Sequence, residues 1–257
     1  MDTNIKSKIS IITVTRNRAS FIAQAIESAQ KQSFVDWELL VLDDDSNDAT
    51  EAILSQYTAK DSRISYYKNS PALGISGNRN KGLSLAIGKY LAVLDSDDFW
   101  LDENKLQKQY DFLEQNSDYI LIGSNIKIIN EKGDFIKETN FATEDIEIRK
   151  KILKDNQIPH SSVLIRKDEL DKIGGYNEKL SCVEDLDLFL KLGKIGKFKN
   201  LPEITTAYTR HSGGYSHQRK IAMAWNHFKI IIKNFGRYPN WTMAIIWAGL
   251  RLAKSLF

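Results

Sequence analysis

The stretch Ile9 to Thr15, ISIITVT, is rich in β-branched residues and has no regular alternation of apolar and polar positions. This pattern is typical of a strand that is covered on both faces within a parallel sheet. After a turn at 16–20, apolar residues recur at helical spacing as far as Gln30. The chain therefore opens with a central strand and a helix, the repeating unit of α/β folds.

The alternation of strand and helix continues as far as Leu94. We expect strands at 37–42, 63–68 and 90–94, separated by helices at 48–57 and 76–87. Such alternation implies right-handed crossovers and a mostly parallel, Rossmann-like sheet with helices on both faces. In sheets of this kind, ligands bind beyond the carboxyl ends of the strands.

The second half of the chain predicts a mixed α+β arrangement. Its expected elements are helices at 104–115, 167–173 and 183–192, strands at 119–129, 135–139 and 162–165, and C-terminal apolar helices at 219–235 and 241–256. The strands at 119–129 and 135–139 read as a small antiparallel hairpin. We predict one α/β domain over 1–215, divided near residue 100, and a helical appendage over 216–257.

Composition limits the classes of function. The 36 basic and 33 acidic residues give a net charge of +3, which does not support nucleic-acid binding. The single Cys182 excludes an internal disulfide and a thiolate metal site, and it indicates a reducing compartment such as the cytosol. The sequence MDTNIKSK at 1–8 has no signal-peptide core, and no run of about 18 apolar residues occurs. We therefore expect neither export nor a membrane span.

Three acidic clusters stand where this topology places ligands. They are Asp43-Asp44-Asp45-Ser46 after the second strand, Asp95-Ser96-Asp97-Asp98 after the fourth, and Glu184-Asp185 at the start of a helix. Adjacent carboxylates raise one another's pKa and destabilise the fold unless a cation or hydrogen-bond donors compensate. The Asp95-x-Asp97 spacing puts two carboxylates on one side of an extended backbone, which suits a ribose and a hard ion such as Mg²⁺ or Mn²⁺.

The alternative interpretation is that these aspartates are helix caps and turn residues. It is as good as the functional one for Asp45, Ser46 and Asp48. It is weaker for the cluster that begins at Asp95, because a cap needs one carboxylate and three follow a buried strand.

Ordered motifs along the chain resemble the family 2 glycosyltransferases with the GT-A fold, over roughly residues 9–215. The motifs are SIITVTRNR at 10–18, DDDSND at 43–48, GNRNKG at 77–82, DSDD at 95–98, HSSV at 160–163, GGYNE at 174–178 and EDLDL at 184–188. One departure lies after the first strand, where the family usually has Pro-Thr-Tyr-Asn and this chain has Val14-Thr15-Arg16-Asn17. Arg16 therefore replaces an aromatic residue near the nucleotide base.

The resemblance implies a role for individual residues in the transfer of a sugar from a nucleoside diphosphate, most simply UDP. The implied nucleotide-binding residues are Val14, Thr15, Arg16, Asp44, Arg79, Asp95 and Ser96. The implied ligands of Mn²⁺ or Mg²⁺ are Asp97, Asp98 and His211, the last in a segment that closes over the diphosphate in related enzymes. Asp185 is the implied general base of an inverting reaction, with Glu184 and His160 beside the acceptor.

Simpler interpretations exist for several of these residues. Arg79 fits a surface salt bridge, and the two histidines fit surface or packing positions. An acid at the position of Asp185 also compensates a helix dipole. Neighbours on a helix do not face each other, so we expect only one of Glu184 and Asp185 to reach the acceptor.

The C-terminal apolar helices have two open interpretations. They either pack on the catalytic domain or form a homodimer contact, or they attach the enzyme to a membrane surface, which suits their aromatic and basic residues. We hypothesise the second, because a glycan or lipid-linked glycan acceptor at the inner face of the cell membrane would make attachment useful.

The favoured interpretation is a glycosyltransferase that acts in cell-surface polysaccharide or lipopolysaccharide synthesis. Two other classes of function are alternatives to it. A sugar nucleotidyltransferase should carry a glycine-rich loop after the first strand, and 15–18 contains no glycine. An inactive glycan-binding module should lack Asp97 or Asp185, and both are present.

Overall fold

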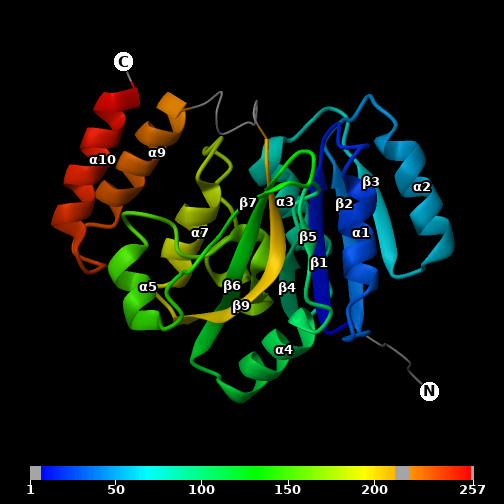
Figure 1. Cartoon of the computed structure of the whole chain (residues 1–257), viewed down its shortest axis with the longest axis horizontal. Coiled ribbons are helices and arrows are strands. Elements are labelled where there is room, and N and C mark those ends of the chain that lie inside the picture. Colours follow the sequence, from blue (N-terminus) through cyan, green and yellow to red (C-terminus); the bar gives the residue numbers. More distant parts are fainter. Residues whose placement is uncertain (1–6, 212–219, 256–257) are drawn as a thin grey trace.

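The computed structural model describes residues 7–211 and 220–255, which form a layered α/β structure (Figure 1). The strands are β1 (Ile9–Thr15), β2 (Trp37–Asp43), β3 (Ile64–Lys68), β4 (Tyr90–Val93), β5 (Phe99–Trp100), β6 (Tyr119–Asn130), β7 (Phe135–Glu138), β8 (Leu164–Arg166) and β9 (Lys197–Arg210). The predicted boundary between domain and appendage, at 215 and 216, lies outside the described residues.

The helices surround one mixed sheet. They are α1 (Ile22–Gln30), α2 (Thr50–Lys60), α3 (Gly74–Leu85), α4 (Lys105–Gln115), α5 (Asp145–Lys151), the short 3₁₀ helix η1 (His160–Ser162), α6 (Lys167–Lys172), α7 (Glu184–Leu192), α9 (Lys220–Lys233) and α10 (Trp241–Ser255). None of the helices within the described ranges is both long and apolar enough to span a bilayer.

The sheet has the strand order β3-β2-β1-β4-β8-β6-β9-β5, with β7 attached to β6. Strands β3, β2, β1 and β4 are parallel, as the alternation predicts, and β6 also runs parallel to β9. Strand β8 is antiparallel to both β4 and β6, and it joins the two halves of the sheet. The predicted hairpin is confirmed as β6 and β7.

Strand β1 is buried on both faces, which explains why ISIITVT shows no alternation. Ile9 and Ile11 pack in one hydrophobic cluster with α1, α2 and α4, whereas Ile12 packs in a second cluster with α3, α6 and α7. Helices therefore cover both faces of the sheet. Parallel strands of this kind end at one edge, and this edge carries the acidic clusters.

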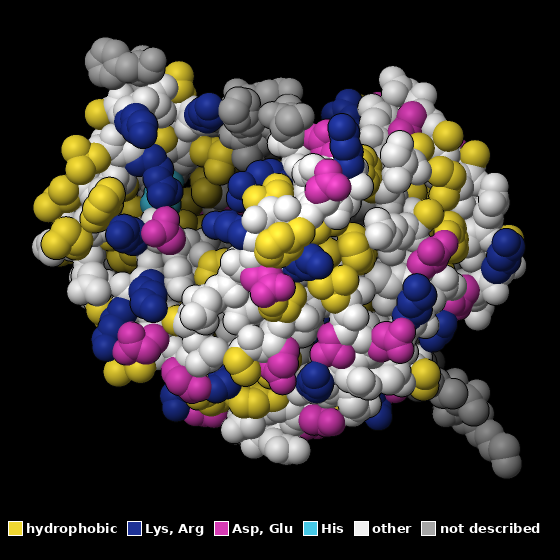
Figure 2. Space-filling model, viewed as in Figure 1, with side chains coloured by type: hydrophobic (Ala, Val, Ile, Leu, Met, Phe, Trp, Pro, Cys, Tyr) yellow, Lys and Arg dark blue, Asp and Glu magenta, His cyan; other side chains and the backbone are white. Residues whose placement is uncertain are grey.

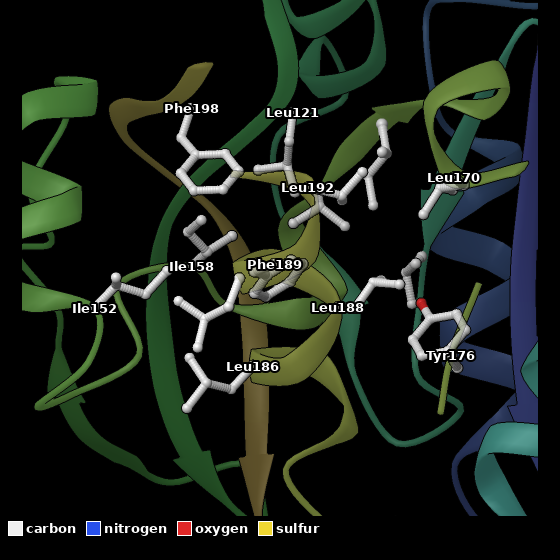
Figure 3. Close-up of a cluster of buried hydrophobic side chains, with 14 of the residues drawn as sticks. Leu121, Ile152, Ile158, Leu170, Tyr176, Leu186, Leu188, Phe189, Leu192 and Phe198 are labelled. Atoms are coloured by element: carbon white, nitrogen blue, oxygen red, sulfur yellow. The ribbon is translucent and has the colours of Figure 1, made fainter. Parts of the chain in front are cut away.

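Helix α7 fixes the second cluster, because most of its side chains are buried. Figure 3 shows Phe189 at the centre of this cluster, with Leu186 and Leu192 beside it and Leu188 directed toward Tyr176. Burial of each such side chain contributes roughly 1.5–3 kcal/mol. The start of α7, which carries Glu184 and Asp185, is therefore held by a rigid core.

The pattern of the sequence does not predict α5 or the 14-residue strand β9. Strand β9 contains Pro202 and several charged residues, a pattern that reads as a loop. It is nevertheless a strand because it pairs with β6 along nearly its whole length, and shifts of register near Ser124 and Asn125 accommodate the irregular stretch that contains Pro202.

Helices α9 and α10 pack against each other and against α7. The Trp241 indole donates to the Ile231 carbonyl at 2.7 Å, and the Tyr238 hydroxyl donates to the Leu190 carbonyl at 3.0 Å. The predicted pair of C-terminal helices is confirmed, and its inner face belongs to the core of the molecule.

Candidate active site

The ends of β1 and β2 form the first part of the site. The Asp44 amide donates to the Thr15 carbonyl at 2.8 Å, and the Asp44 carboxylate accepts the amides of Leu73 and Gly74 at 2.7 and 2.9 Å. Asp44 thus fixes the loop before α3 to the strand end. Val14 is half-buried, and the buried Thr15 hydroxyl has no partner among the described residues.

Most other polar residues near this strand end have structural functions. Asp43 accepts hydrogen bonds from Ser46 and from the Tyr66 hydroxyl, and Asp48 accepts from Thr50 and the Ala19 amide. The turn and cap interpretation is therefore correct for Ser46 and Asp48. Arg16 is exposed, beyond the end of β1.

A buried arginine joins the end of β4 to the start of α7. Arg79 on α3 is 3% exposed, and its guanidinium contacts Asp95 at 2.8 Å and Glu184 at 2.5 Å. Burial lowers the pKa of Arg79, but the two carboxylates outweigh that effect and raise it overall. Burial alone would raise the pKa of Asp95, but the nearby Arg79 and His160 outweigh the effect of burial, so the pKa of Asp95 is lowered overall.

This bridge corrects two expectations. Arg79 is neither a surface residue nor directed at a ligand, because both terminal nitrogens of its guanidinium are used by carboxylates. Glu184 is buried with its carboxylate on Arg79, so it is turned away from any acceptor. Both residues instead position the groups around them.

Asp185 points to a different side of α7 from Glu184, as helical geometry predicts. The half-buried Asp185 carboxylate accepts a hydrogen bond from the Asn156 side-chain amide at 3.1 Å and one from the Leu186 backbone amide at 2.8 Å. Burial and the adjacent Glu184 raise the pKa of Asp185. Val183, which precedes the helix, has a left-handed φ of 58°. Such strain in a β-branched residue is typical of functional sites.

Asp97 and His211 lie side by side. The Nε2 atom of His211 is 2.8 Å from Asp97 Oδ2, and the Arg18 Nε atom is 3.4 Å from the same oxygen. The rings of His211 and Phe21 pack edge to face. Asp97 and His211 are 114 residues apart in the sequence but adjacent in the structure, and two ligands of one metal ion must be adjacent.

Asp98 is directed into the protein, unlike Asp97. Its carboxylate accepts the Ser161 hydroxyl at 2.5 Å and the Thr209 amide at 2.9 Å, and it is 2% exposed. Burial, with Asp97 and Asp95 nearby, raises its pKa well above the ordinary value. This placement corrects the expectation of a metal ligand, because both oxygens already hold β9 and η1 in place.

His160 lies between the end of β4 and α7. Its Nε2 atom is 2.9 Å from the Tyr176 hydroxyl, and its Nδ1 atom is 3.6 Å from Asp95. The ring also packs against Phe189. These contacts fit the packing interpretation of His160, and its contact with an acceptor stays a prediction. Ser96, which is also buried, adjoins the same strand end.

Sequence reasoning missed four residues that hold this arrangement. Ser161 contacts both the Asp95 amide and Asp98, Asn156 donates to Asp185, Tyr176 contacts His160, and Arg18 contacts Asp97. Ser161, Tyr176 and Arg18 lie in motifs quoted above, so the motifs could have identified them. Asn156 lies in an irregular segment and gave no signal.

Within the described part of the chain, no three His, Cys, Asp or Glu side chains converge as a metal site. Asp97 and His211 are nevertheless partly exposed. A carboxylate oxygen suits both Mg²⁺ and Mn²⁺, whereas an imidazole nitrogen is a ligand of transition metals, so this pair fits Mn²⁺ better than Mg²⁺. Two protein donors fit an ion whose other ligands are diphosphate oxygens.

Comparisons with known proteins agree with this geometry. The model of the family "Glycosyl transferase family 2" matches residues 10–173. The chain is 34% identical over 209 residues to the uncharacterized glycosyltransferase MJ1057 of Methanocaldococcus jannaschii, which covers 79% of this chain and 71% of that protein. It is 41% identical over 122 residues, 48% of this chain and 47% of the relative, to UDP-Glc:alpha-D-GlcNAc-diphosphoundecaprenol beta-1,3-glucosyltransferase WfgD of Escherichia coli.

The fold is also similar to a solved structure. The mannosyltransferase PcManGT from Pyrobaculum calidifontis, in complex with GDP-Man and Mn²⁺, superposes with a TM-score of 0.70 at 15% identity, and the match covers 97% of this chain and 75% of that one. At this identity, the likeness shows the GT-A fold alone. The family model matches more than half of the chain, and the relative MJ1057 is 34% identical over 79% of it. These two matches show that the chain belongs to glycosyl transferase family 2.

Proposed function

We propose that this glycosyltransferase transfers a sugar from a UDP-sugar to a hydroxyl of a glycan or lipid-linked glycan, with inversion at the anomeric carbon. The observation that carries the proposal is the buried bridge of Asp95, Arg79 and Glu184. It holds the strand end proposed to bind the donor at a fixed place relative to the helix that carries Asp185.

The donor nucleotide is proposed to lie over the ends of β1, β2 and β4. Val14, Thr15 and Asp44 would contact the base, since Thr15 offers a buried hydroxyl that has no partner among the described residues and the Asp44 carboxylate is fixed beside it by the amides of Leu73 and Gly74. Arg16 lies exposed beside them, and Asp95 with Ser96 adjoins the ribose. UDP is supported by the relative WfgD, whose name specifies UDP-Glc as donor.

Asp97 and His211 are the proposed ligands of a divalent ion, and the neighbour PcManGT with Mn²⁺ supports this assignment. When bound, such an ion neutralises the negative charge that grows on the departing diphosphate. Arg18, 3.4 Å from Asp97, adds a second positive charge on the same side.

Asp185 is the proposed general base. An acceptor hydroxyl attacks the anomeric carbon as the bond to the diphosphate oxygen breaks, and the diphosphate leaves with the electron pair. The hydroxyl proton passes to the Asp185 carboxylate, whose raised pKa makes it a stronger base than an ordinary aspartate. Asn156 orients the carboxylate.

The acceptor and the place of action belong to the same proposal. WfgD acts, by its name, on a sugar linked to diphosphoundecaprenol. A lipid-linked acceptor in the synthesis of a cell-surface polysaccharide would require this enzyme to act in the cytoplasm, at the inner face of the cell membrane.

A donor screen followed by one substitution tests the proposal. Thermal shifts with UDP-, GDP- and dTDP-sugars, each with and without Mn²⁺, should show stabilisation by UDP-sugars that increases with Mn²⁺. Asp97→Asn should lose the Mn²⁺-dependent part. No shift with any nucleotide sugar would contradict the proposal.

Asp185→Asn then separates binding from chemistry. We expect this variant to bind the donor as the wild type does and to lose transfer by about 10²-fold to 10⁴-fold. The surface variant Asp171→Asn is the matched control and should keep full activity. Full activity of Asp185→Asn would remove Asp185 as the base.

A further inference from the structure

Helices α9 and α10 and the turn between them carry eight of the seventeen large apolar side chains that are exposed in the described ranges. Four of them, Met243, Ile246, Trp247 and Leu250, are spaced three or four residues apart and form one stripe along α10. Trp225 and Phe235 add exposed aromatic rings from α9 and the turn after it. The outer face of this helix pair is therefore apolar, although its inner face already belongs to the core.

The same segment has an extreme charge composition. Residues 220–255 contain six Lys or Arg and no Asp or Glu. Subtracting these six from the 36 basic residues leaves 30 against 33 acidic residues, a net charge of −3 for the rest of the chain. The net positive charge of this protein thus comes from its C-terminal helices and the turn between them.

Apolar and basic side chains lie next to each other on this surface. Figure 2 shows hydrophobic side chains along the outer edge of the α9 and α10 region, with Lys and Arg side chains beside them. The Lys154 ammonium lies 4.4 Å from the centre of the Trp247 ring, and the Lys229 ammonium lies 4.9 Å from that of Trp225. Exposed indoles with neighbouring ammonium groups are suited to the headgroup region of a bilayer.

We propose that the outer face of α9 and α10 docks onto a membrane that contains anionic lipids. Exposed basic residues such as Lys229 and Lys254 would lie near the lipid phosphates while the α10 stripe enters the acyl boundary. Lys233 and Arg251 instead pair with Asp187 and Asp155 of the catalytic part. A second copy of the chain fits this face poorly. A two-fold contact would place two acid-free, positively charged surfaces against each other.

The docking surface is connected to the proposed catalytic base from two sides. Asn226 on α9 donates to the Cys182 sulfur at 3.4 Å, three residues before Asp185. Arg251 on α10 pairs with Asp155 at 3.1 Å, and the next residue, Asn156, donates to Asp185. A membrane under these helices would hold a lipid-linked acceptor close to Asp185, a consequence that rests on the proposed function.

Vesicle sedimentation of the full chain tests the docking surface without any sugar nucleotide. Phosphatidylcholine vesicles that contain phosphatidylglycerol should bind the wild type, pure phosphatidylcholine vesicles should bind it much less, and added salt should weaken binding. The triple variant Met243→Ser, Ile246→Ser, Leu250→Ser should bind at least about tenfold more weakly. Lys229→Glu with Lys254→Glu should weaken binding to the anionic vesicles only.

A matched triple variant controls for the loss of exposed apolar surface elsewhere. Val35→Ser, Ile87→Ser, Ile146→Ser removes three side chains that are similarly exposed but lie outside α9 and α10, and it should bind vesicles as the wild type does. Wild-type binding by the α10 triple variant would overturn the proposal, as would a wild type that ignores anionic vesicles. A wild-type dimer that the α10 variant dissociates would identify a second copy as the occupant instead.

The thermal shift with UDP and Mn²⁺ separates this proposal from the proposed function. Because all substituted side chains are exposed and none lies at the carboxyl ends of β1, β2 and β4, every variant should keep the nucleotide shift of the wild type. Loss of vesicle binding with an unchanged nucleotide shift supports the docking surface. An absent nucleotide shift in a wild type that still binds vesicles would contradict the transferase chemistry alone.

Discussion

At the scale of single residues, the site depends on two adjacent carboxylates with different partners. Glu184 is buried against Arg79, whereas Asp185 faces Asn156 on another side of the helix. The sequence predicted this divergence, because neighbours on a helix do not share a face. It could not predict the partner of Glu184, which lies 105 residues away and meets it only through the packing of α3 on α7.

The pH dependence of transfer should reveal the influence of Glu184 on Asp185. Transfer needs the ionised base, so activity falls as the pH drops through the pKa of Asp185. Glu184 raises that pKa, and Glu184→Gln should therefore lower it and move the acid limb of kcat/KM to lower pH. The distant Glu169→Gln should leave the profile in place, and an acid limb that stays or rises in Glu184→Gln would contradict the assignment.

Removal of Arg79 should destabilise the whole fold. Arg79→Met would leave Asp95 and Glu184 without their shared cation, and breaking a buried pair of this kind costs about 3–5 kcal/mol. The exposed Lys172→Met should leave the free energy of unfolding nearly unchanged. Urea denaturation of both variants measures the difference, and equal stability would show that Arg79 is not needed to hold the strand end to α7.

At the scale of elements, periodicity predicted the strands and helices whose apolar residues are regularly spaced. It missed the strand that forms only because it pairs with a distant strand. The strand and helix alternation up to Leu94 was confirmed because the helices bury one face each and the inner parallel strands β1, β2 and β4 are buried on both, whereas the edge strand β3 is partly buried. Strand β9 was missed because Pro202 and its charged neighbours conceal a strand that exists through its pairing with β6. The strand-end carboxylates could also be located from the sequence, because they directly follow strands that the apolar pattern predicts.

The turn between α6 and α7 offers a matched pair of substitutions. Gly174 and Gly175 both have positive φ, but a Cβ atom at Gly175 would lie 2.7 Å from the Asn80 side-chain oxygen, whereas one at Gly174 would meet nothing within 4 Å. Gly174→Ala should cost about 1–2 kcal/mol through backbone strain alone. Gly175→Ala should cost roughly 1–3 kcal/mol more because of the added contact.

Thermal or urea unfolding of the two glycine variants provides the measurement. The difference isolates the contact with Asn80, whose side chain also bonds the backbone of Tyr176 at 2.9 and 3.0 Å. Equal costs for the two variants would mean that Asn80 moves aside freely and does not fix this turn.

At the scale of the whole molecule, two parts of opposite charge meet at Asp185. The sheet and its helices carry the strand-end carboxylates, and the positively charged helices α9 and α10 rest on Cys182 and Asp155 beside the proposed base. Sequence patterning predicted both parts. It could not show that the second part contacts the segments around Asp185, because those contacts come from irregular loops.

The stereochemistry of donor hydrolysis tests the central claim most directly, because water can take the place of an unidentified acceptor. The UDP-sugar with the largest thermal shift is incubated with enzyme and Mn²⁺, and the first sugar released is followed by proton NMR before its anomers equilibrate. Attack from the face opposite the diphosphate predicts the β-anomer from an α-linked donor, with release lost in Asp185→Asn. Initial release of the α-anomer, or unchanged release by Asp185→Asn, would contradict the account.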